Sequence, residues 1–192
     1  MTNIKVLVLE GGYNEEHEIS IITAKEVKRA IKELNYKLES IVVNPINFHN
    51  EIKKYQHIDL CFNALHGPYG EDGTIQQVLL DNNLKFSHSG INASKNAFNK
   101  NLTKLAISKT IINYPKSIQF SKEKIIKSFF LECFKNIGAF VLKPVSSGSS
   151  FGIKIFRSIR DIDFFFYNFN NEIIIYKKFN INLEWEIIII GA

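Results

Sequence analysis

The first 90 residues alternate short apolar runs with segments of helical periodicity, and this alternation constrains the fold more than any other feature of the chain. Strands that alternate with helices favour an open parallel sheet whose faces are both covered. We predict a helix that follows Asn14, its N-cap, and a shorter helix from about Thr74. The apolar runs predict strands at 4–9, 38–43, 58–65 and 84–86.

The pattern changes after the turn-like stretch "SHSGINAS". The later segments predict a mixed α+β unit with an antiparallel sheet. The expected fold class is therefore α/β, with a first domain at 1–90 and a second at 91–192. In the second domain we predict helices at about 92–112, 123–137 and 159–169, and strands at 116–120, 140–142, 152–156, 172–179 and 183–190.

Composition limits the classes of partner. The chain has 192 residues, with 24 Lys and Arg against 19 Asp and Glu, and a net charge of +5. The lysines are scattered, which favours a solvated surface and indicates no nucleic-acid partner. No apolar stretch approaches the ~20 residues that span a bilayer, so no membrane association is predicted. Cys61 and Cys133 lack metal-ligand spacing, and reduced, buried thiols indicate a cytoplasmic protein.

The densest polar motif is "KPVSSGSSFG" at 143–152, directly after an apolar run. Its backbone N–H groups and hydroxyls could form a concave array that suits phosphate oxygens, with Lys143 as a point charge. The spacing does not match G-x-x-x-x-G-K-[ST], so the motif is not a P-loop. A hairpin loop with solubilising serines is the alternative, and the residues alone leave both interpretations open.

Two further motifs lie where predicted strands end. "NALHGPYGEDGTIQ" at 63–76 occupies the edge where open α/β sheets bind ligands. Its His66 is either a polar anchor or a histidine satisfied by local hydrogen bonds, and Glu71 and Asp72 could be no more than solvated turn acids. "GGYNEEHEIS" at 11–20 places carboxylates at a helix start, where they could pair with a substrate ammonium group or offset the helix dipole.

These motifs, taken together and in order, resemble the D-alanine–D-alanine ligases of the ATP-grasp superfamily along essentially the whole chain. The resemblance implies a pre-ATP-grasp substrate domain at 1–90 and an incomplete α+β ATP-grasp domain at 91–192. Members of the family phosphorylate the carboxylate of one D-alanine with ATP, and the amine of a second D-alanine attacks the acyl phosphate. The product is the dipeptide used in peptidoglycan. The matching stretches are "GGYNEEHEIS", "NALHGPYGEDGTIQ", "SHSGINASKNAFNK" and "VLKPVSSGSSFGI".

The resemblance also implies roles for single residues. Glu16 is expected to contact the ammonium group of the first D-alanine, and His66 to lie near the substrate carboxylate and the acyl phosphate. Ser149 is expected to hydrogen-bond in the same site and to orient the helix that carries Glu16. The residues expected to hold ATP are Lys100, Lys143, Ser149, Ser150, Gly152 and, at the ribose, Glu184.

Three positions depart from the family pattern. His88 stands where the family usually has Gly, and Asn99 stands where an Asp commonly precedes the lysine. Lys177 lies about where the family favours an acidic residue near the adenine amino group, and this reversal of charge should weaken adenine recognition.

The resemblance further implies Mg²⁺, but the family's Asp, Glu and Asn ligands and an Arg lie in a segment beyond Ala192. No metal ligand is therefore assigned in this chain. The sequence looks truncated, its apolar strand at 183–190 is expected to lack neighbours, and little ligase activity is expected of 192 residues alone. The alternatives are an inactive remnant, one half of a split ligase, or an ATP-grasp ligase for another amino acid. A homodimer matches the family tendency.

Overall fold

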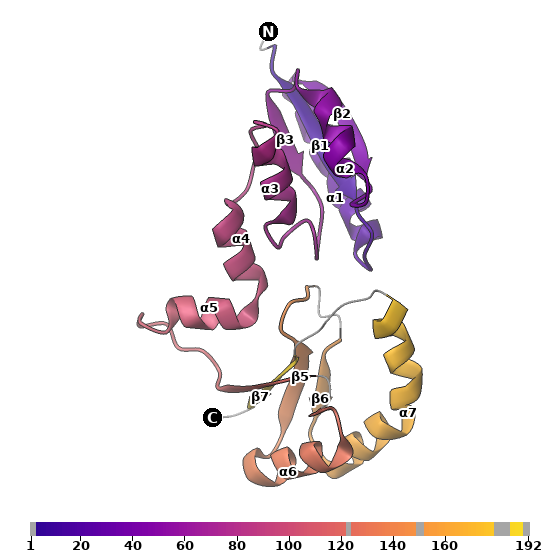
Figure 1. Ribbon diagram of the computed structural model, residues 1–192, viewed down its shortest axis with the longest axis vertical. Coiled ribbons are helices and arrows are strands. Elements are labelled where there is room, and N and C mark those ends of the chain that lie inside the picture. Colours follow the sequence, from indigo (N-terminus) through magenta and orange to yellow (C-terminus); the bar gives the residue numbers. More distant parts are fainter. Residues whose placement is uncertain (1–2, 122–123, 149–151, 179–184, 190–192) are drawn as a thin grey trace. The chain divides into compact units, whose positions relative to one another are not determined.

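The computed structural model describes residues 3–121, 124–148, 152–178 and 185–189. The chain divides into two compact units, residues 1–99 and 100–192 (Figure 1). Each unit has its own sheet and its own buried core. The domain boundary predicted near residue 90 stays a prediction.

The first unit is built on a parallel sheet of three strands in the order β2-β1-β3, which confirms the predicted open parallel sheet. β1 lies in the centre and is buried on both faces, because successive side chains of a strand point in opposite directions. Val6 and Val8 belong to one core cluster, and Leu7 and Leu9 belong to another. The bounds are Lys5–Gly11 for β1, Lys37–Val43 for β2 and Leu60–Asn63 for β3.

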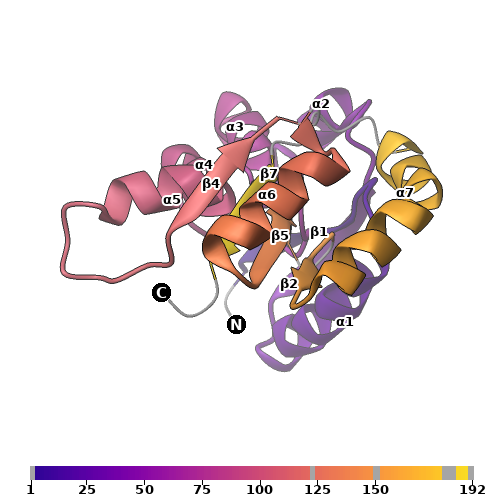
Figure 2. The ribbon, with the colours of Figure 1, turned by 90° about the horizontal axis from the view of Figure 1, so that it is seen from below.

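Helices cover both faces of this sheet, as predicted (Figures 1 and 2). On one face, α1 (His17–Glu33) packs Ala24 and Ile31 against Val6 and Val8. On the other face, Leu7 and Leu9 pack against short elements that bury Phe48, Ile52, Ile75 and Leu79. These elements are α2 (Phe48–Glu51), the 3-10 helix η1 (Ile52–Tyr55) and α3 (Thr74–Asp81), and α4 (Ile91–Phe98) follows them.

The strand predicted at 84–86 is wrong. This segment makes one isolated parallel bridge, between Cys61 and Phe86. The Cys61 N–H group donates to the Lys85 carbonyl at 2.8 Å, and Ser87 N–H donates to the Cys61 carbonyl at 3.0 Å. The pairing goes no further because the backbone turns at His88, whose φ is +106°.

The second unit contains an antiparallel sheet in the order β4-β7-β5-β6, which confirms the predicted sheet type. β7 lies between β4 and β5 and pairs with both, so the expectation that this apolar strand lacks neighbours is wrong. Chain order did not reveal its central place, because its partners are distant in sequence. The bounds are Ser117–Phe120 for β4, Phe140–Pro144 for β5, Lys154–Phe156 for β6 and Trp185–Ile189 for β7.

An aromatic core lies on one face of this sheet. Phe130 is fully buried, and its ring stacks on that of Phe165 and meets those of Phe140 and Phe156 edge to face. Phe130 and Phe165 come from α6 (Lys127–Ile137) and α7 (Ile159–Lys178), which cover this face. The opposite face carries the alternate residues of the strands, and α5 (Lys100–Ile107) contacts it through Lys104.

Two predictions of helix and strand in the second half are wrong. The single helix predicted at 92–112 is two helices, α4 and α5, because Asn99 between them adopts an extended backbone with φ −91° and ψ 111°. In place of the strand predicted at 172–179, residues 172–178 belong to α7, which continues to Lys178, and residue 179 lies outside the described residues. A short apolar run such as "IIIY" fits a strand and a helix equally well, and here the preceding helix continues through it.

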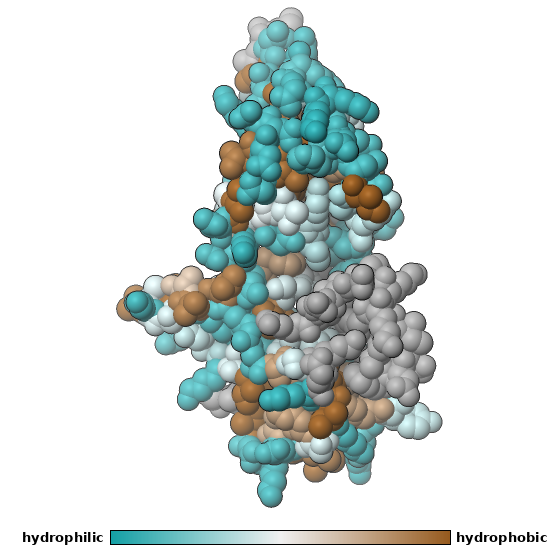
Figure 3. Space-filling view, in the orientation of Figure 1, coloured by the Kyte–Doolittle hydropathy of each residue, from teal (hydrophilic) through white to brown (hydrophobic). Residues whose placement is uncertain are grey.

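None of the helices in the described residues has the length and apolar character needed to cross a bilayer. Hydrophilic residues predominate on the face of the first unit drawn in Figure 3.

Candidate functional site

The first candidate site lies at the carboxyl ends of β1 and β3, where two loops of the first unit meet. Neighbouring parallel strands bring these ends to one edge of the sheet, the usual position of ligand sites in such folds. Asn14 joins the two loops: its side-chain NH₂ group donates to the carbonyls of His66, at 2.8 Å, and Pro68, at 3.1 Å. Its side-chain oxygen accepts the Glu16 N–H at 2.8 Å.

The prediction that Asn14 is the N-cap of α1 is wrong. The helix begins at His17, and Glu16 occupies the N-cap position without a side-chain cap bond. Asn14 lies two residues earlier, and its carbonyl group shapes the turn that leads into the helix. Asn14 therefore holds two loops together and does not cap the helix.

Ser20 fixes the first turn of α1 to both strand ends. Its hydroxyl accepts the Gly11 N–H and donates to the Ala64 carbonyl, each at 2.8 Å, and the side chain is fully buried. Sequence reasoning gave Ser20 no role. The available signal was its spacing, because Ser20 lies one helical turn after Glu16 and so faces the same side of the helix.

Glu16 is buried, with 4% of its surface exposed. Its carboxylate lies against Gly67, where an added Cβ would overlap the Glu16 Oε2 atom. Gly67 also has a φ of +70°, a conformation that glycine adopts without steric cost. The structure thus brings Glu16 and the residue that follows His66 into direct proximity.

His66 is partly exposed and held by two neighbours. Its Nε2 atom and the Thr23 hydroxyl share a hydrogen bond of 2.9 Å, and its Nδ1 atom lies 3.7 Å from the Glu71 Oε1 atom. Both interpretations of His66 are compatible with this geometry, since an imidazole with local partners is also oriented for a ligand. Thr23 was not singled out in the sequence.

Glu71 and Asp72 organise the turn that carries His66, and this corrects their interpretation as solvated acids. Glu71 Oε2 accepts the Gly67 N–H at 3.1 Å. The two carboxylate oxygens of Asp72 accept the N–H groups of Tyr69 and Thr74, each at 2.9 Å. Burial, followed by the charge of Asp72, raises the pKa of Tyr69 to about 12, so its phenol stays neutral.

The second candidate site lies in the second unit, on the face of the antiparallel sheet opposite the aromatic core. The pairing of β5 with β7 places Lys143 directly across from Glu186, and their side chains form an ion pair of 3.3 Å. Lys104 of α5 reaches the other oxygen of the Glu186 carboxylate and also donates to the Ser117 hydroxyl at 2.6 Å. The carboxylate is therefore held from β5 and from α5.

Lys100 completes this lysine cluster, which we define as Lys100, Lys104 and Lys143. Lys100 lies one helical turn before Lys104, so the two side chains share a face of α5. Its ammonium group donates to the carbonyls of Val145, at 3.2 Å, and Ser147, at 2.9 Å. Lys100 thus ties α5 to the start of the serine-rich loop.

In this cluster a buried carboxylate lies among partly buried lysines, and their charges influence one another. Burial by itself disfavours the charged form of Glu186, but the hydrogen bond from Lys104 and the charges of Lys104 and Lys143 outweigh it and hold its pKa below the ordinary value. Burial and then the charge of Lys143 lower the pKa of Lys100, which Glu186 partly offsets. A further anion near these lysines would be attracted by their positive charges, as the Glu186 carboxylate is.

The predicted site residues therefore fall into two groups. Glu16 and His66 lie in the first unit, and Lys100 and Lys143 lie together in the second. Gly152 is in a turn before β6 with φ +74°. Ser149, Ser150 and Glu184 lie outside the described residues, as does the side chain of Lys177. Sequence reasoning missed Lys104 and the role of Glu186, although the spacing of Lys100 and Lys104 gave a signal for the former.

His88, one of the departures from the family pattern, has an unusual backbone conformation. Its φ of +106° lies in the region that favours glycine, the residue that the family usually has there. Its ring packs edge to face on Phe62, with ring centroids 5.5 Å apart. A histidine adopts this backbone conformation only with strain, and in this conformation its ring makes the contact with Phe62.

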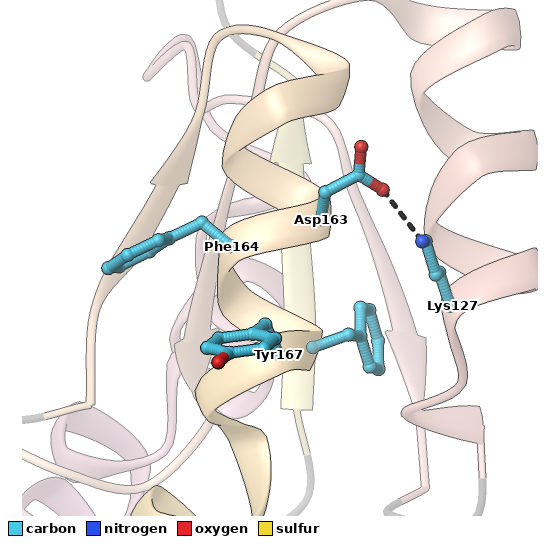
Figure 4. Close-up of a pocket in the computed structure, with 5 residues that line it drawn as sticks. Lys127, Asp163, Phe164 and Tyr167 are labelled. Atoms are coloured by element: carbon cyan, nitrogen blue, oxygen red, sulfur yellow. Dashed lines mark ion pairs between the residues drawn. The ribbon is translucent and has the colours of Figure 1, made fainter.

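A hollow elsewhere on the second unit is lined by none of the residues predicted for the site. It is lined by residues of α6 and α7, with Lys127 and Asp163 paired at 2.7 Å and the rings of Phe164 and Tyr167 on the exposed side of α7 (Figure 4). It lies on the helical side of the sheet, away from the lysine cluster.

Within the described ranges, no group of three His, Cys, Asp or Glu side chains could hold a metal ion.

Comparison with known proteins places this geometry in context. No protein-family model matches the chain. A D-alanine–D-alanine ligase of Wolbachia from Brugia malayi is 39% identical over 158 residues, which cover 82% of this chain and 45% of the relative. A crystal structure of the D-alanine–D-alanine ligase from Bacillus anthracis is 29% identical and superposes with a TM-score of 0.74, covering 96% of this chain and 57% of that one. The ATP complex of the Bacillus anthracis enzyme gives a TM-score of 0.72 at 26% identity, covering 96% and 58%.

A parallel-sheet unit followed by an α+β unit with an antiparallel sheet, matched over nearly the whole chain, defines the ATP-grasp class of fold. Within that class, the chain is a relative of the D-alanine–D-alanine ligases. It spans about half the length of the curated relatives that it matches.

Proposed function

We propose that this protein takes part in the ATP-dependent joining of two D-alanine molecules to D-alanyl-D-alanine, the reaction for which its relatives are named. The lysine cluster is the observation that carries the proposal. It brings three lysines together on the polar face of a sheet, two of them paired with one carboxylate, in a chain whose solved relatives include an ATP complex. Such a cluster suits the oxygens of a triphosphate.

The first unit supplies the binding site for the first D-alanine in this proposal. Glu16 is a buried carboxylate at a sheet edge, and it would pair with the substrate ammonium group. His66 would face the substrate carboxylate, with its orientation fixed by Thr23 and Glu71. Phosphorylation is needed because a free carboxylate is a poor electrophile, and the phosphate becomes the leaving group.

The second unit holds ATP in this proposal. Lys100 and Lys143 would contact the phosphates, and Ser149, Ser150 and Gly152 would form the loop that closes over them. Glu184 would hold the ribose. Transfer of a phosphoryl group depends mainly on positioning and on cations that offset the developing charge, and lysines that are held in place contribute to both.

Magnesium is the ion that ATP-dependent ligases of this kind are expected to use. The described residues offer no cluster of acids that fits it, and the carboxylate in the lysine cluster is already paired with ammonium groups. We therefore assign no magnesium ligand in this chain.

The test is a coupled assay of the purified chain with ATP, D-alanine and magnesium. Phosphate release that requires D-alanine, together with D-alanyl-D-alanine detected by chromatography, supports the proposal for the 192-residue chain. ATP binding without product assigns to this chain the nucleotide site alone. If the chain binds neither ATP nor D-alanine at millimolar concentrations, the proposal is wrong.

Lys143→Ala tests the assignment of the phosphate site. We expect at least a tenfold loss of ATP affinity, because a charge-assisted contact to a phosphate is removed. Lys127→Ala is the matched control, since Lys127 is an exposed lysine of the same unit that pairs with Asp163 on the opposite side of the sheet. Equal affinity in the wild type and Lys143→Ala would remove Lys143 from the site.

We further propose that the protein is cytoplasmic and forms homodimers, as the family resemblance suggests. Sedimentation equilibrium across a range of protein concentrations measures the oligomeric state directly, and a monomer at all concentrations would contradict the dimer.

A further inference from the structure

Glu186 is a fully buried acid at the centre of the lysine cluster. It alternates along β7 with Trp185 and Ile187, which point into the aromatic core on the other face of the sheet. The strand periodicity thus commits Glu186 to the polar face. There it contacts Lys143 at 3.3 Å and also pairs with Lys104.

One partner of Glu186, Lys143, is also a residue that the proposed function assigns to phosphate, and the other, Lys104, belongs to the same cluster. With three lysines and one carboxylate, the cluster has a net charge of +2 when all four groups are ionised. Glu186 therefore lies beside Lys143 where a bound anion would otherwise lie. A phosphate oxygen that contacts the Lys143 ammonium would approach a carboxylate of like charge within a few ångströms.

We propose that Glu186 is an internal counter-ion that keeps the lysine cluster assembled and competes with phosphate for it, so that this residue sets the affinity for the nucleotide. The proposal rests on the proposed function, because it takes the cluster as the phosphate site. Glu186 acts through the lysines and is a positioning residue rather than a catalytic one.

Two physical consequences follow from this role. Without an anion, three neighbouring ammonium groups repel one another, and the buried carboxylate offsets that repulsion. With a phosphate bound, the same carboxylate repels the ligand and weakens its binding. A purely structural carboxylate would produce the first consequence, whereas only a competing counter-ion produces both.

The test is Glu186→Gln, which keeps the shape of the side chain and removes its charge. We expect a lower melting temperature in the absence of anions, and binding of inorganic tripolyphosphate and of ATP that is on the order of tenfold tighter than in the wild type. Isothermal titration measures the affinity, and the fluorescence of Trp185, the single tryptophan of the chain, reports the melting of this unit.

Asp163→Asn is the matched control. It makes the same change of charge in the same unit, but Asp163 is half exposed and pairs with Lys127 on the helical side of the sheet. Its tripolyphosphate affinity should stay within about twofold of the wild type, because exposed charges are screened. If both variants tighten binding equally, the effect is one of net charge and the proposal is overturned.

A second comparison guards against loss of folding in Glu186→Gln. The double variant Lys104→Gln/Glu186→Gln removes the ion pair as a whole, which leaves no uncompensated charge from that pair. It should bind tripolyphosphate about tenfold tighter than Lys104→Gln alone, the variant in which Glu186 still faces Lys143. Equal binding by these two variants would overturn the proposal.

The outcomes also separate this proposal from the proposed function. If the wild type binds ATP and Glu186→Gln binds it no more tightly, the counter-ion proposal is wrong and the proposed function stands. Binding that appears only in Glu186→Gln supports the counter-ion and defeats ATP binding by the native chain. No binding by either protein defeats both.

Discussion

The two candidate sites are assembled by different kinds of interaction. At the edge of the parallel sheet, Asn14 and Ser20 hold the loops through hydrogen bonds to backbone groups. The carboxylates of Glu71 and Asp72 likewise accept backbone N–H groups there, so the geometry depends mainly on hydrogen bonds between side chains and the backbone. On the face of the antiparallel sheet, Glu186 and the lysine cluster depend on ionised groups that are largely withdrawn from water. The stability of the first site should therefore depend mainly on the size of its side chains, and that of the second on charge and pH.

The largest effect is expected from Lys104→Met. Removing this ammonium group deprives a buried carboxylate of its closest partner, at a cost of about 3–5 kcal/mol in the free energy of unfolding. Urea denaturation followed by Trp185 fluorescence measures this loss in the second unit.

Lys127→Met provides the control for that experiment. Its ion pair with Asp163 is about half exposed, so its loss should cost less than about 1 kcal/mol. Equal losses in the two variants would mean that burial does not distinguish the two ion pairs, and the contrast drawn above would fail.

Gly67→Ala should produce the next largest effect, now in the first unit. A Cβ atom would overlap the Glu16 carboxylate, and alanine would be strained at a φ of +70°, for a combined cost of about 2–3 kcal/mol. Gly90→Ala is a close control, since no atom lies within 4 Å of an added Cβ and φ is −69°. Circular dichroism during thermal melting compares the two, and similar melting temperatures would contradict the close approach of Glu16.

Acidification should affect the second unit by a smaller amount. The pKa of Glu186 in the folded state lies below its unfolded value, so the unfolded chain takes up the proton first as the pH falls. The stabilisation is complete above the ordinary glutamate pKa of about 4.3 and is lost as the pH drops through the folded-state value.

Urea midpoints from Trp185 fluorescence across acidic pH measure this dependence. Glu186→Gln should show a weaker decline than the wild type, because it lacks the titrating group. An unchanged pH dependence in that variant would show that other carboxyl groups account for the acid sensitivity of the unit.

The smallest effect is expected from His88→Gly. Glycine relieves the strain of a φ of +106°, while it loses the ring contact with Phe62 and adds freedom to the unfolded chain. The net result should be a gain of about 1 kcal/mol in the free energy of unfolding. Ala in the same position should not stabilise the protein, and a gain with Ala would assign the effect to the side chain rather than to the backbone.

The sequence predicted those parts of the fold that depend on local pattern. The alternation around β1 identified a parallel sheet, because a strand buried on both faces reads as a continuous apolar run. It also placed Glu16 and His66 at one edge, since the ends of neighbouring parallel strands lie together.

The parts that sequence reasoning missed depend on distant partners or on single backbone angles. The central place of β7 follows from pairing with β4 and β5, which lie far away in the chain. The break between α4 and α5 depends on the extended conformation of Asn99 alone. The role of Glu186 required the register of β5 against β7, which no local pattern encodes.

The central position of β7 has a consequence for synthesis on the ribosome. The parallel sheet can form as soon as residue 63 has emerged, because all its strands come from the first third of the chain. The antiparallel sheet cannot join β4 to β5 until residues 185–189 arrive to fill the gap between them. Until then the aromatic side chains of this half have no closed sheet to cover them, and a nascent chain paused before that point would be a natural client for chaperones.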